Sequence, residues 1–266
     1  MPKSTYFYWI SKEDTPEDPL VALIREIVTT HRGRYGYRRV VLELHHRGYR
    51  VNHKKVLRIM RENGLLCTKF RHRHRRYKSY RGTVGTIAKN ELRRRFQTDR
   101  PFQKLLTDVS EMRYEGGKLY ISPVLDCYGG YILSCSIHTN PTLEFAGSSL
   151  QRALAERPAL PYRTIVHSDQ GWQYQHRSWR KILKQHRARQ SMSRKGNCLD
   201  NAQMENFFGI LKQEMYYGES FASYEELKAA IKDYIYYYNH QRRSQKLNGM
   251  TPEEFRNHSV QIMRSN

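Results

Sequence analysis

The N-terminal quarter of the chain carries its apolar side chains at helical spacing. Leu20, Ile24 and Ile27 fall on one face of a first predicted helix. Two more short helices are predicted over 37–46 and 53–63, because glycines and a capping asparagine bound these stretches. The third helix has a basic outer face. This arrangement is typical of a helix-turn-helix, whose later helix enters the major groove of DNA, although ordinary helical bundles share it.

A strongly basic run without an apolar face follows. KFRHRHRRYKSYR, residues 69–81, contains seven Lys or Arg, two His and three aromatic residues. Such a run is often solvated, but aromatic side chains among arginines can also stack on bases while the basic groups follow a phosphate backbone. Residues 69–103 are therefore predicted to be a basic arm and a linker, with the arm ordering on DNA.

The pattern changes to strands after residue 104. The runs KLLTDVSEMRYEGG, KLYISPVLDCYGG and YILSCSIH are typical of three strands joined by glycine-rich turns. Helical and strand patterns then alternate, as in an RNase H-like α/β fold. We therefore expect a polar tail (1–19), a helix-turn-helix domain (20–68), a basic arm and linker (69–103) and an RNase H-like domain (104–260).

Charge supports a nucleic-acid partner for the front of the chain. The chain has 47 Lys and Arg against 25 Asp and Glu, a formal net charge of +22. Residues 1–103 hold 25 basic and 9 acidic residues, whereas the remainder holds 22 and 16. This asymmetry indicates a polyanion-binding module joined to a second domain. On charge alone, a generally basic or ribosome-associated protein stays open.

Cysteine and apolar content indicate the compartment. The four cysteines form no CxxC pair, which argues against a disulfide framework or a Cys-rich zinc site. No apolar run approaches the roughly 18–20 residues of a membrane span. The N-terminus also lacks the pattern of a signal peptide. We therefore expect a cytoplasmic protein that binds no membrane.

Three acidic residues fit a two-metal site. Such a site needs carboxylates from different elements to hold two Mg²⁺ ions roughly 3.5–4 Å apart. Asp108 lies in the middle of the first strand pattern, and Asp169 ends a buried strand, where open α/β sheets bind ligands. Glu205 borders the buried stripe of a predicted helix. Each acid alone is more often a surface or cap residue, but the intervals of 60 and 35 residues between them favour a shared site.

The polar residues near the three acids have predicted positions that indicate their roles. On an ideal helix Asn201, Glu205 and Lys212 lie within about 60° of one another and would face one cleft. Asp200 precedes this helical run and is interpreted as an N-terminal helix residue rather than a ligand. Asp126 precedes a turn and is interpreted in the same structural way.

The amino-acid sequence around the three acids resembles that of a known family. The matching segments are TDVSE, VHSDQGWQY, SMSRKGNCLDNAQMENFFGILKQE and YIYYYNHQRRSQKLNGMTPEEF, with YGYRRV and VNHKKVLRIMRENGL in the front part. The chain resembles the second-frame (OrfB) protein of IS-three family insertion-sequence transposases, which is similar to retroviral integrases in its DDE catalytic core. It lacks the paired cysteines of the integrase zinc module, so it is interpreted as the insertion-sequence version.

The resemblance implies a fold and a chemistry. The fold would be an RNase H-like catalytic core, a five-stranded mixed sheet with flanking helices, preceded by a small all-α helix-turn-helix domain. Asp108, Asp169 and Glu205 would be catalytic and would bind two Mg²⁺ ions, for which Mn²⁺ substitutes. Lys212 would contact DNA near them, and Lys195 in the adjacent loop would approach phosphate.

Further residues and partners follow from the same resemblance. Residues of the motif before the third acid would shape the entry of its helix: Asn197, Asp200 and Asn201. The other expected DNA contacts are Arg38, Arg39, Lys54, Lys55, Arg58, Arg71, Arg73, Arg75 and Arg76. The implied partners are double-stranded DNA at terminal inverted repeats and target, further copies of the chain, and the first-frame (OrfA) segment in cis or in trans. The implied location is the bacterial cytoplasm, in association with the nucleoid.

The sequence has three alternative interpretations besides a DDE transposase. A catalytically silent DNA-binding regulator would show the same charge and the same helix-turn-helix, but would not need three spaced acids. A tyrosine recombinase is disfavoured, because its Arg and His must converge from separate positions, and Tyr234 and Tyr238 are better interpreted as packing residues. An RNase H-like nuclease acting on hybrids is disfavoured by the DNA-binding front part.

Overall fold

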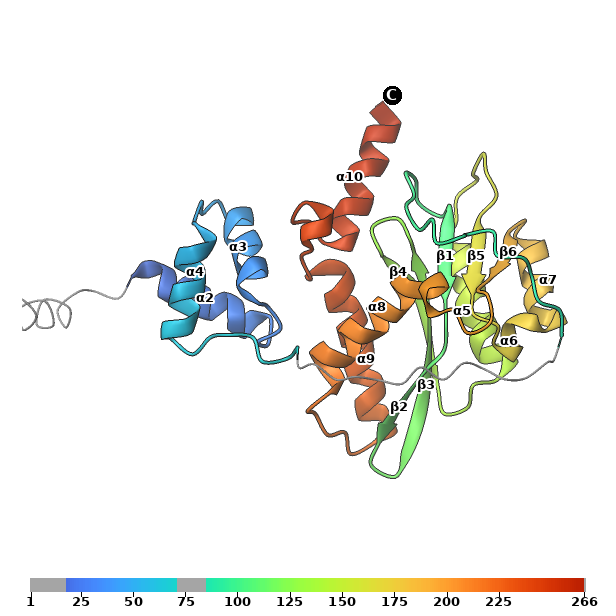
Figure 1. Ribbon diagram of the computed structural model, residues 1–266, viewed down its shortest axis with the longest axis horizontal. Coiled ribbons are helices and arrows are strands. Elements are labelled where there is room, and N and C mark those ends of the chain that lie inside the picture. Colours follow the sequence, from blue (N-terminus) through green and yellow to red (C-terminus); the bar gives the residue numbers. More distant parts are fainter. Residues whose placement is uncertain (1–17, 71–84, 266) are drawn as a thin grey trace, which may run out of the picture. The chain divides into compact units, whose positions relative to one another are not determined.

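The computed structural model describes residues 18–70 and 85–265 of the chain (Figure 1). Two units, Met1–Phe70 and Arg71–Asn266, are each described by themselves. Most of the predicted polar tail lies outside the described residues, as do four predicted DNA contacts of the basic arm: Arg71, Arg73, Arg75 and Arg76.

The described part of the N-terminal unit contains three helices, α2 (Pro19–Thr30), α3 (Tyr37–His46) and α4 (His53–Glu62). Asn52 caps α4, since its side chain accepts a hydrogen bond from Lys54 N at 2.8 Å. The three predicted helices and this cap are confirmed. The buried apolar side chains of the helices are Val21, Ile24, Ile27, Val40, Leu44, Val56, Ile59 and Met60.

A mixed sheet forms the centre of the C-terminal unit. Its strands are β1 (Lys104–Thr107), β2 (Ser110–Tyr114), β3 (Gly117–Asp126), β4 (Ile132–His138), β5 (Ile165–Ser168) and β6 (Arg189–Met192). β3 runs antiparallel to β4 on one side and to β1 and β2 on the other, whereas β1, β5 and β6 are parallel. Because β1 and β2 share one line along β3, the sheet has the five predicted positions, and the RNase H-like fold is confirmed.

The break between β1 and β2 falls at Asp108. Thr107 pairs with Val124, and the same register continues from β2, which places Asp108 opposite Pro123. Counted from the two-residue hairpin turn after β2, this row is one in which the two strands would exchange hydrogen bonds. Proline has no N–H to donate, so the ladder is interrupted there. The expectation of a continuous strand through Asp108 is therefore wrong.

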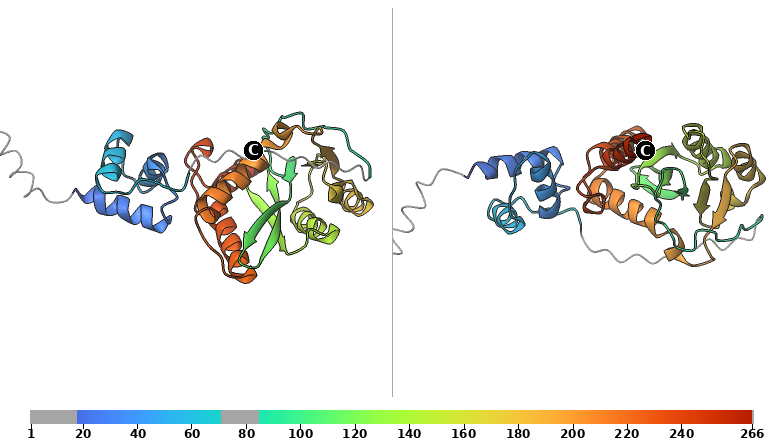
Figure 2. Two further views of the ribbon diagram at one scale, coloured as in Figure 1. Left: turned by 60° about the horizontal axis from the view of Figure 1, so that its bottom comes forward. Right: turned by 90° about the horizontal axis from the view of Figure 1, so that it is seen from above.

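Helices cover both faces of this sheet: α5 and α7 lie on one side and α8 and α9 on the other (Figure 2). The helices are α5 (Leu143–Ala155), α6 (Trp172–Gln175), α7 (Arg177–Gln185), α8 (Ala202–Leu211), α9 (Tyr224–His240) and α10 (Pro252–Ser265). The expected helix over 199–216 differs from the structure, since a 3-10 turn (Cys198–Asn201) precedes α8 and a π turn (Lys212–Tyr216) follows it. Within the described ranges, no helix has the length and apolarity needed to cross a bilayer.

Asp126, at the end of β3, has a structural role. Its buried carboxylate accepts hydrogen bonds from Phe102 N at 2.8 Å, from Tyr128 N at 3.0 Å and from Arg256 Nη1 at 2.7 Å. These bonds join the chain before β1 and the helix α10 to the end of the sheet. The interpretation of Asp126 as a turn residue agrees with these contacts.

A second buried ion pair fixes the π turn after α8. The carboxylate of Glu214 accepts hydrogen bonds from Arg242 Nη2 at 2.8 Å and from Tyr234 OH at 2.9 Å. The side chains of Glu214 and Arg242 are 0% and 7% exposed. The turn begins at Lys212, and Glu214 holds it against α9 through Tyr234 and against the residues after α9 through Arg242.

We expect Glu214→Ala to lower the free energy of unfolding by about 3–5 kcal/mol, because it leaves the Arg242 guanidinium buried without its partner. Urea unfolding followed by circular dichroism measures this loss. The control is Glu225→Ala, whose side chain is 75% exposed and pairs with Lys228 at 3.3 Å. That change should cost less than about 1 kcal/mol. Equal losses in the two variants would contradict the prediction.

Candidate active site

The parallel pairing of β1 with β5 brings the first two acids together. Leu106 pairs with His167, and two residues further along the same register Asp108 comes opposite Asp169. Both acids directly follow the last residue of their strand. Neighbouring residues of adjacent strands point to the same face of a sheet, so the two carboxylates lie on one side. The predicted interval of 60 residues therefore corresponds to a lateral neighbour in the sheet.

The carboxyl group of Asp108 is in an unfavourable environment for a charge. Burial raises its pKa well above the ordinary value, and the charges of Asp169 and Glu205 raise it further. Two groups oppose this shift: Val109 N donates a hydrogen bond to Asp108 Oδ1 at 2.7 Å, and the positive charge of Lys212 favours the carboxylate. Both other predicted acids therefore act electrostatically on Asp108.

Asp169 is held by the turn that follows β5. Its Oδ1 accepts a hydrogen bond from Gly171 N at 2.8 Å, which lowers the pKa of Asp169, while burial raises it above the ordinary value. A β-carbon at position 171 would lie 2.9 Å from Asp169 Oδ1 and 3.3 Å from Tyr174 Cδ2. The sequence DQG after β5 thus allows the backbone to approach the carboxylate closely.

Glu205 borders this pair from the first turn of α8. It is exposed, and partial burial raises its pKa. Among the residues that the structure describes, no three His, Cys, Asp or Glu side chains are close enough to form a metal-binding group. The donor set nevertheless fits a hard divalent cation, because adjacent carboxylates with raised pKa values are stabilised by a positive charge.

The residues predicted to share a face with Glu205 have different environments. Asn201 is 4% exposed and lies in the 3-10 turn, and neither polar atom of its side chain has a hydrogen-bond partner among the described residues. Lys212 is also buried, and its Nζ donates to Ser110 Oγ at 2.6 Å and to Glu111 O at 3.1 Å. Its ammonium group therefore lies inside the protein beside β2, near Asp108.

The motif before Glu205 forms an ion-paired loop. The buried carboxylate of Asp200 accepts hydrogen bonds from Arg194 Nε at 2.9 Å and from Arg94 Nε at 3.0 Å. Arg94 also donates to Asn197 Oδ1 at 3.0 Å. Lys195, in the same loop, is exposed. Arg94 was not among the predicted site residues. It lies in a predicted linker, and the hydrophobic pattern of a linker does not indicate that one of its residues binds a distant buried carboxylate such as Asp200.

His167 lies two residues before Asp169, but both of its ring nitrogens contact serine side chains. Its Nδ1 is 2.8 Å from Ser191 Oγ and its Nε2 is 3.0 Å from Ser193 Oγ. Burial lowers the pKa of His167 to about 4. Both ring nitrogens are therefore engaged by serines of β6 and the loop after it.

The predicted DNA contacts of the N-terminal unit differ in exposure. Arg38, Lys54 and Arg58 are exposed. The Cζ atom of Arg39 lies 5.8 Å from the ring centre of Tyr35, and its guanidinium donates to the backbone carbonyl of Arg34. Lys55 forms an ion pair with the carboxylate of Asp18 at 2.7 Å. The first three therefore present their charges to solvent, whereas the other two also stabilise the unit.

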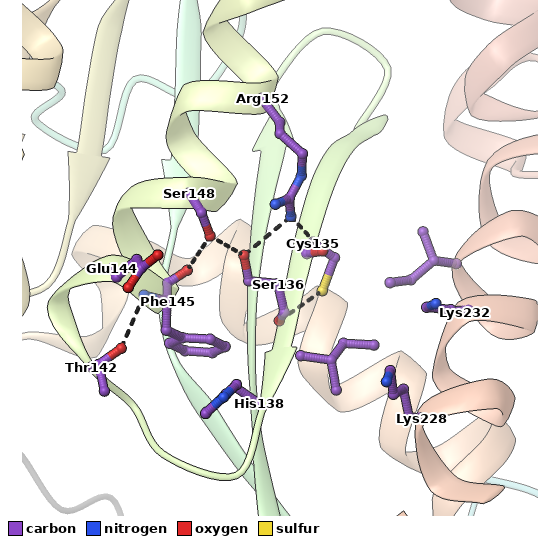
Figure 3. A pocket seen from close by; sticks show the side chains of 12 residues that line it. Cys135, Ser136, His138, Thr142, Glu144, Phe145, Ser148, Arg152, Lys228 and Lys232 are labelled. Carbon is purple, nitrogen blue, oxygen red and sulfur yellow. Dashed lines mark hydrogen bonds between the residues drawn. The ribbon is translucent and has the colours of Figure 1, made fainter. Parts of the chain in front are cut away.

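A cavity of about 520 Å³ opens elsewhere, between β4, α5 and α9 (Figure 3). None of the three acids lines it. Two of its cationic side chains have protein partners, since Arg152 donates to Cys135 O and Ser136 Oγ and Lys228 pairs with Glu225. This cavity is distinct from the candidate active site.

Family models match most of the chain. Residues 98–198 and residues 205–260 match two models described as integrase core domain. Residues 15–74 match a model described as HTH-like domain. The second acid lies in the first of these core segments and the third acid begins the other.

Known proteins resemble the chain over most of its length. It is 46% identical over 260 residues to the Escherichia coli protein InsK, named as a transposase of insertion sequence element IS150, covering 97% of this chain and 90% of InsK. It is 36% identical over 235 residues to the E. coli transposase InsF for insertion sequence IS3A, covering 87% and 80%. A solved simian T-cell lymphotropic virus intasome is similar in fold alone, with a TM-score of 0.52 and 16% identity over 88% of this chain and 74% of that one.

We expect Asp108→Asn to raise the melting temperature of the metal-free protein near neutral pH. Since the pKa of Asp108 is raised on folding, ionisation destabilises the folded state as the pH rises above about 3.8. The gain should be present at about pH 7.5 and vanish at about pH 4. Thermal denaturation in EDTA over this pH range measures it. The matched control is Asp233→Asn, at an exposed position of α9, and an equal gain in that variant would contradict the prediction.

Proposed function

This chain belongs to the IS-three family of insertion-sequence transposases, and we propose that it catalyses DNA strand cleavage and strand transfer at the ends of such an element. The observation that carries the proposal is the pairing of Asp108 with Asp169 at the carboxyl ends of two parallel strands, with Glu205 at their border. Asp108 and Asp169 follow adjacent strands and Glu205 lies in α8; each has a raised pKa, and a bound cation would stabilise the ionised form of each acid.

The proposed ligands of two Mg²⁺ ions are Asp108, Asp169 and Glu205, with Mn²⁺ able to substitute. When bound, the two ions would activate the attacking oxygen and stabilise the leaving oxygen of a phosphodiester. The attacking group would be water in cleavage and a DNA 3′-hydroxyl in transfer, without a covalent protein intermediate. The chain's own contribution is to hold the carboxylates: Val109 N and Gly171 N each orient one acid through a short hydrogen bond.

Positive charge beside the acids supports a phosphate substrate. The ammonium of Lys212 is fixed near Asp108 by Ser110 and by the backbone of Glu111. Lys195 is exposed in the loop before α8. We infer that Lys212 and Lys195 contact DNA near the scissile phosphate, Lys212 after exchange of its present partners.

The proposed partners follow from the two units. The HTH-like match and the exposed Arg38, Lys54 and Arg58 support binding of double-stranded DNA at the terminal inverted repeats. Synapsis of two ends requires more than one active site, so we propose a homo-oligomer. We also propose that the first-frame (OrfA) segment acts with this chain, in cis or in trans.

A specific observation supports one alternative, a catalytically silent DNA-binding regulator. The three acids do not form a closed metal-binding group among the described residues, and Glu205 is exposed. A protein whose third acid never joined the other two would bind DNA without cleaving it. Cleavage assays on DNA carrying the terminal inverted repeats of the parent element separate the two functions.

We expect Glu205→Gln to lower Mg²⁺-dependent cleavage by at least about 100-fold, since even partners behind a metal ligand are worth 10–100-fold. DNA binding in a gel-shift assay should stay within about twofold, because α8 keeps its packing. The matched control is Glu115→Gln at the exposed hairpin turn, which should cleave like the wild type. Full activity of Glu205→Gln would sink the three-acid mechanism. A wild type that binds but never cleaves, with the first-frame segment supplied, would support the regulator.

A further inference from the structure

The segment 85–103, assigned by its composition to a linker, is fixed against β6 by hydrogen bonds to side chains of that strand. Glu91 N and Leu92 N donate hydrogen bonds to Ser191 Oγ at 2.9 and 3.3 Å, and Ala88 N lies 3.3 Å from Met192 Sδ. The side chain of Leu92 is 1% exposed. Residues that precede β1 in the chain therefore bind side chains of β6.

The same segment also forms hydrogen bonds with the loop that precedes α8. Asn90 Nδ2 donates to Asp200 Oδ2 at 2.9 Å, and Arg94 Nε donates to Asp200 Oδ1 at 3.0 Å. Arg94 Nη2 donates to Asn197 Oδ1 at 3.0 Å. A planar guanidinium that binds a carboxylate and an amide oxygen at once fixes the loop in two directions.

The backbone at Arg94 is in an unfavourable conformation. Arg93 and Arg94 both have positive φ values, +46° and +61°. The left-handed region is unfavourable for residues with a β-carbon, and two in succession are held only when surrounding contacts require them. Here the contacts include those of Arg94 with Asp200 and Asn197, and the hydrogen bond from Arg93 N to Asn90 Oδ1 at 2.8 Å.

Asp200 connects the contacts of Arg94 to the helix that bears Glu205. It lies in the 3-10 turn that leads directly into α8, and Glu205 is in the first turn of that helix. Glu205 is exposed and therefore contributes little packing of its own. The position of its carboxylate depends on how the start of α8 is anchored. Through β6, the same segment is also connected to β5, the strand that Asp169 directly follows.

We infer that Arg94 is a positioning residue: through Asp200 and Asn197 it sets the start of α8, and so sets Glu205 against the Asp108–Asp169 pair. This inference rests on the proposed function of the three acids. It also assigns residues 85–95 to the catalytic unit, so that the chain entering from the DNA-binding unit is bonded to the active-site loop before it enters β1.

The test compares single variants in the full chain. Arg94→Ala keeps a β-carbon and removes the two contacts, whereas Arg93→Ala changes the neighbouring exposed arginine, also at positive φ, and is the matched control. Arg94→Lys can still pair with Asp200 but cannot also reach Asn197, so it should restore part of the function. All variants are assayed for Mg²⁺-dependent cleavage at varied DNA concentration.

We expect Arg94→Ala to lower kcat about 10- to 100-fold with KM changed less than about twofold, because small displacements of a catalytic group cost rates of this order. Arg94→Lys should recover at least part of kcat, and Arg93→Ala should match the wild type. A rise in KM with unchanged kcat would show that Arg94 contacts DNA instead and would overturn the inference, as would equal behaviour of the two alanine variants.

A second readout does not depend on activity. Amide hydrogen exchange of residues 198–211 should be faster in Arg94→Ala than in wild type and Arg93→Ala, because the start of α8 loses an anchor. Unchanged exchange would overturn the inference even if the proposed function holds. If the wild type failed to cleave while the exchange difference was present, the proposed function would fail and the anchoring role of Arg94 would stand.

Discussion

Two carboxylates held side by side in a partly buried position repel each other, and much of the catalytic unit is arranged around that repulsion. The parallel register of β1 and β5 puts Asp108 beside Asp169, and burial makes both charges costly. Local backbone N–H groups and the ammonium of Lys212 offset only part of that cost. A fold that keeps such a pair must be stabilised elsewhere, and the pair is then available for cations.

Three other buried carboxylates of this unit form ion pairs that join distant segments of the chain. Asp126 with Arg256, Glu214 with Arg242, and Asp200 with Arg94 each connect parts of the chain that are far apart in sequence. Each carboxylate is buried, and the second and third pairs border the elements that bear Lys212 and Glu205. Rigid charge pairs therefore surround the acids, while the acids themselves have no cationic side chain bonded to them among the described residues.

The proline at the centre of the sheet shows how a local residue shapes the site. Pro123 lies opposite Asp108 and cannot donate to it, so the strand is interrupted at the first acid. The break separates Asp108 from the regular ladder and lets Val109 N turn toward its carboxylate. A segment whose composition predicts one strand therefore forms two strands, with the first of the three candidate acids between them.

The sequence by itself determined the three helices of the front unit and the order of strands and helices in the core, because periodicity and turns are local properties of the chain. Its intervals and its family resemblance made the acids at 108, 169 and 205 the candidate metal ligands. The tertiary structure alone decided which acids lie side by side, since register depends on partners far apart in sequence. It also decided that Lys212 is buried, that Asp200 binds Arg94 across the fold, and that residues 88–92 contact side chains of β6. Hydrogen bonds and ion pairs between distant segments leave no periodic trace in a sequence, so only the folded chain shows them.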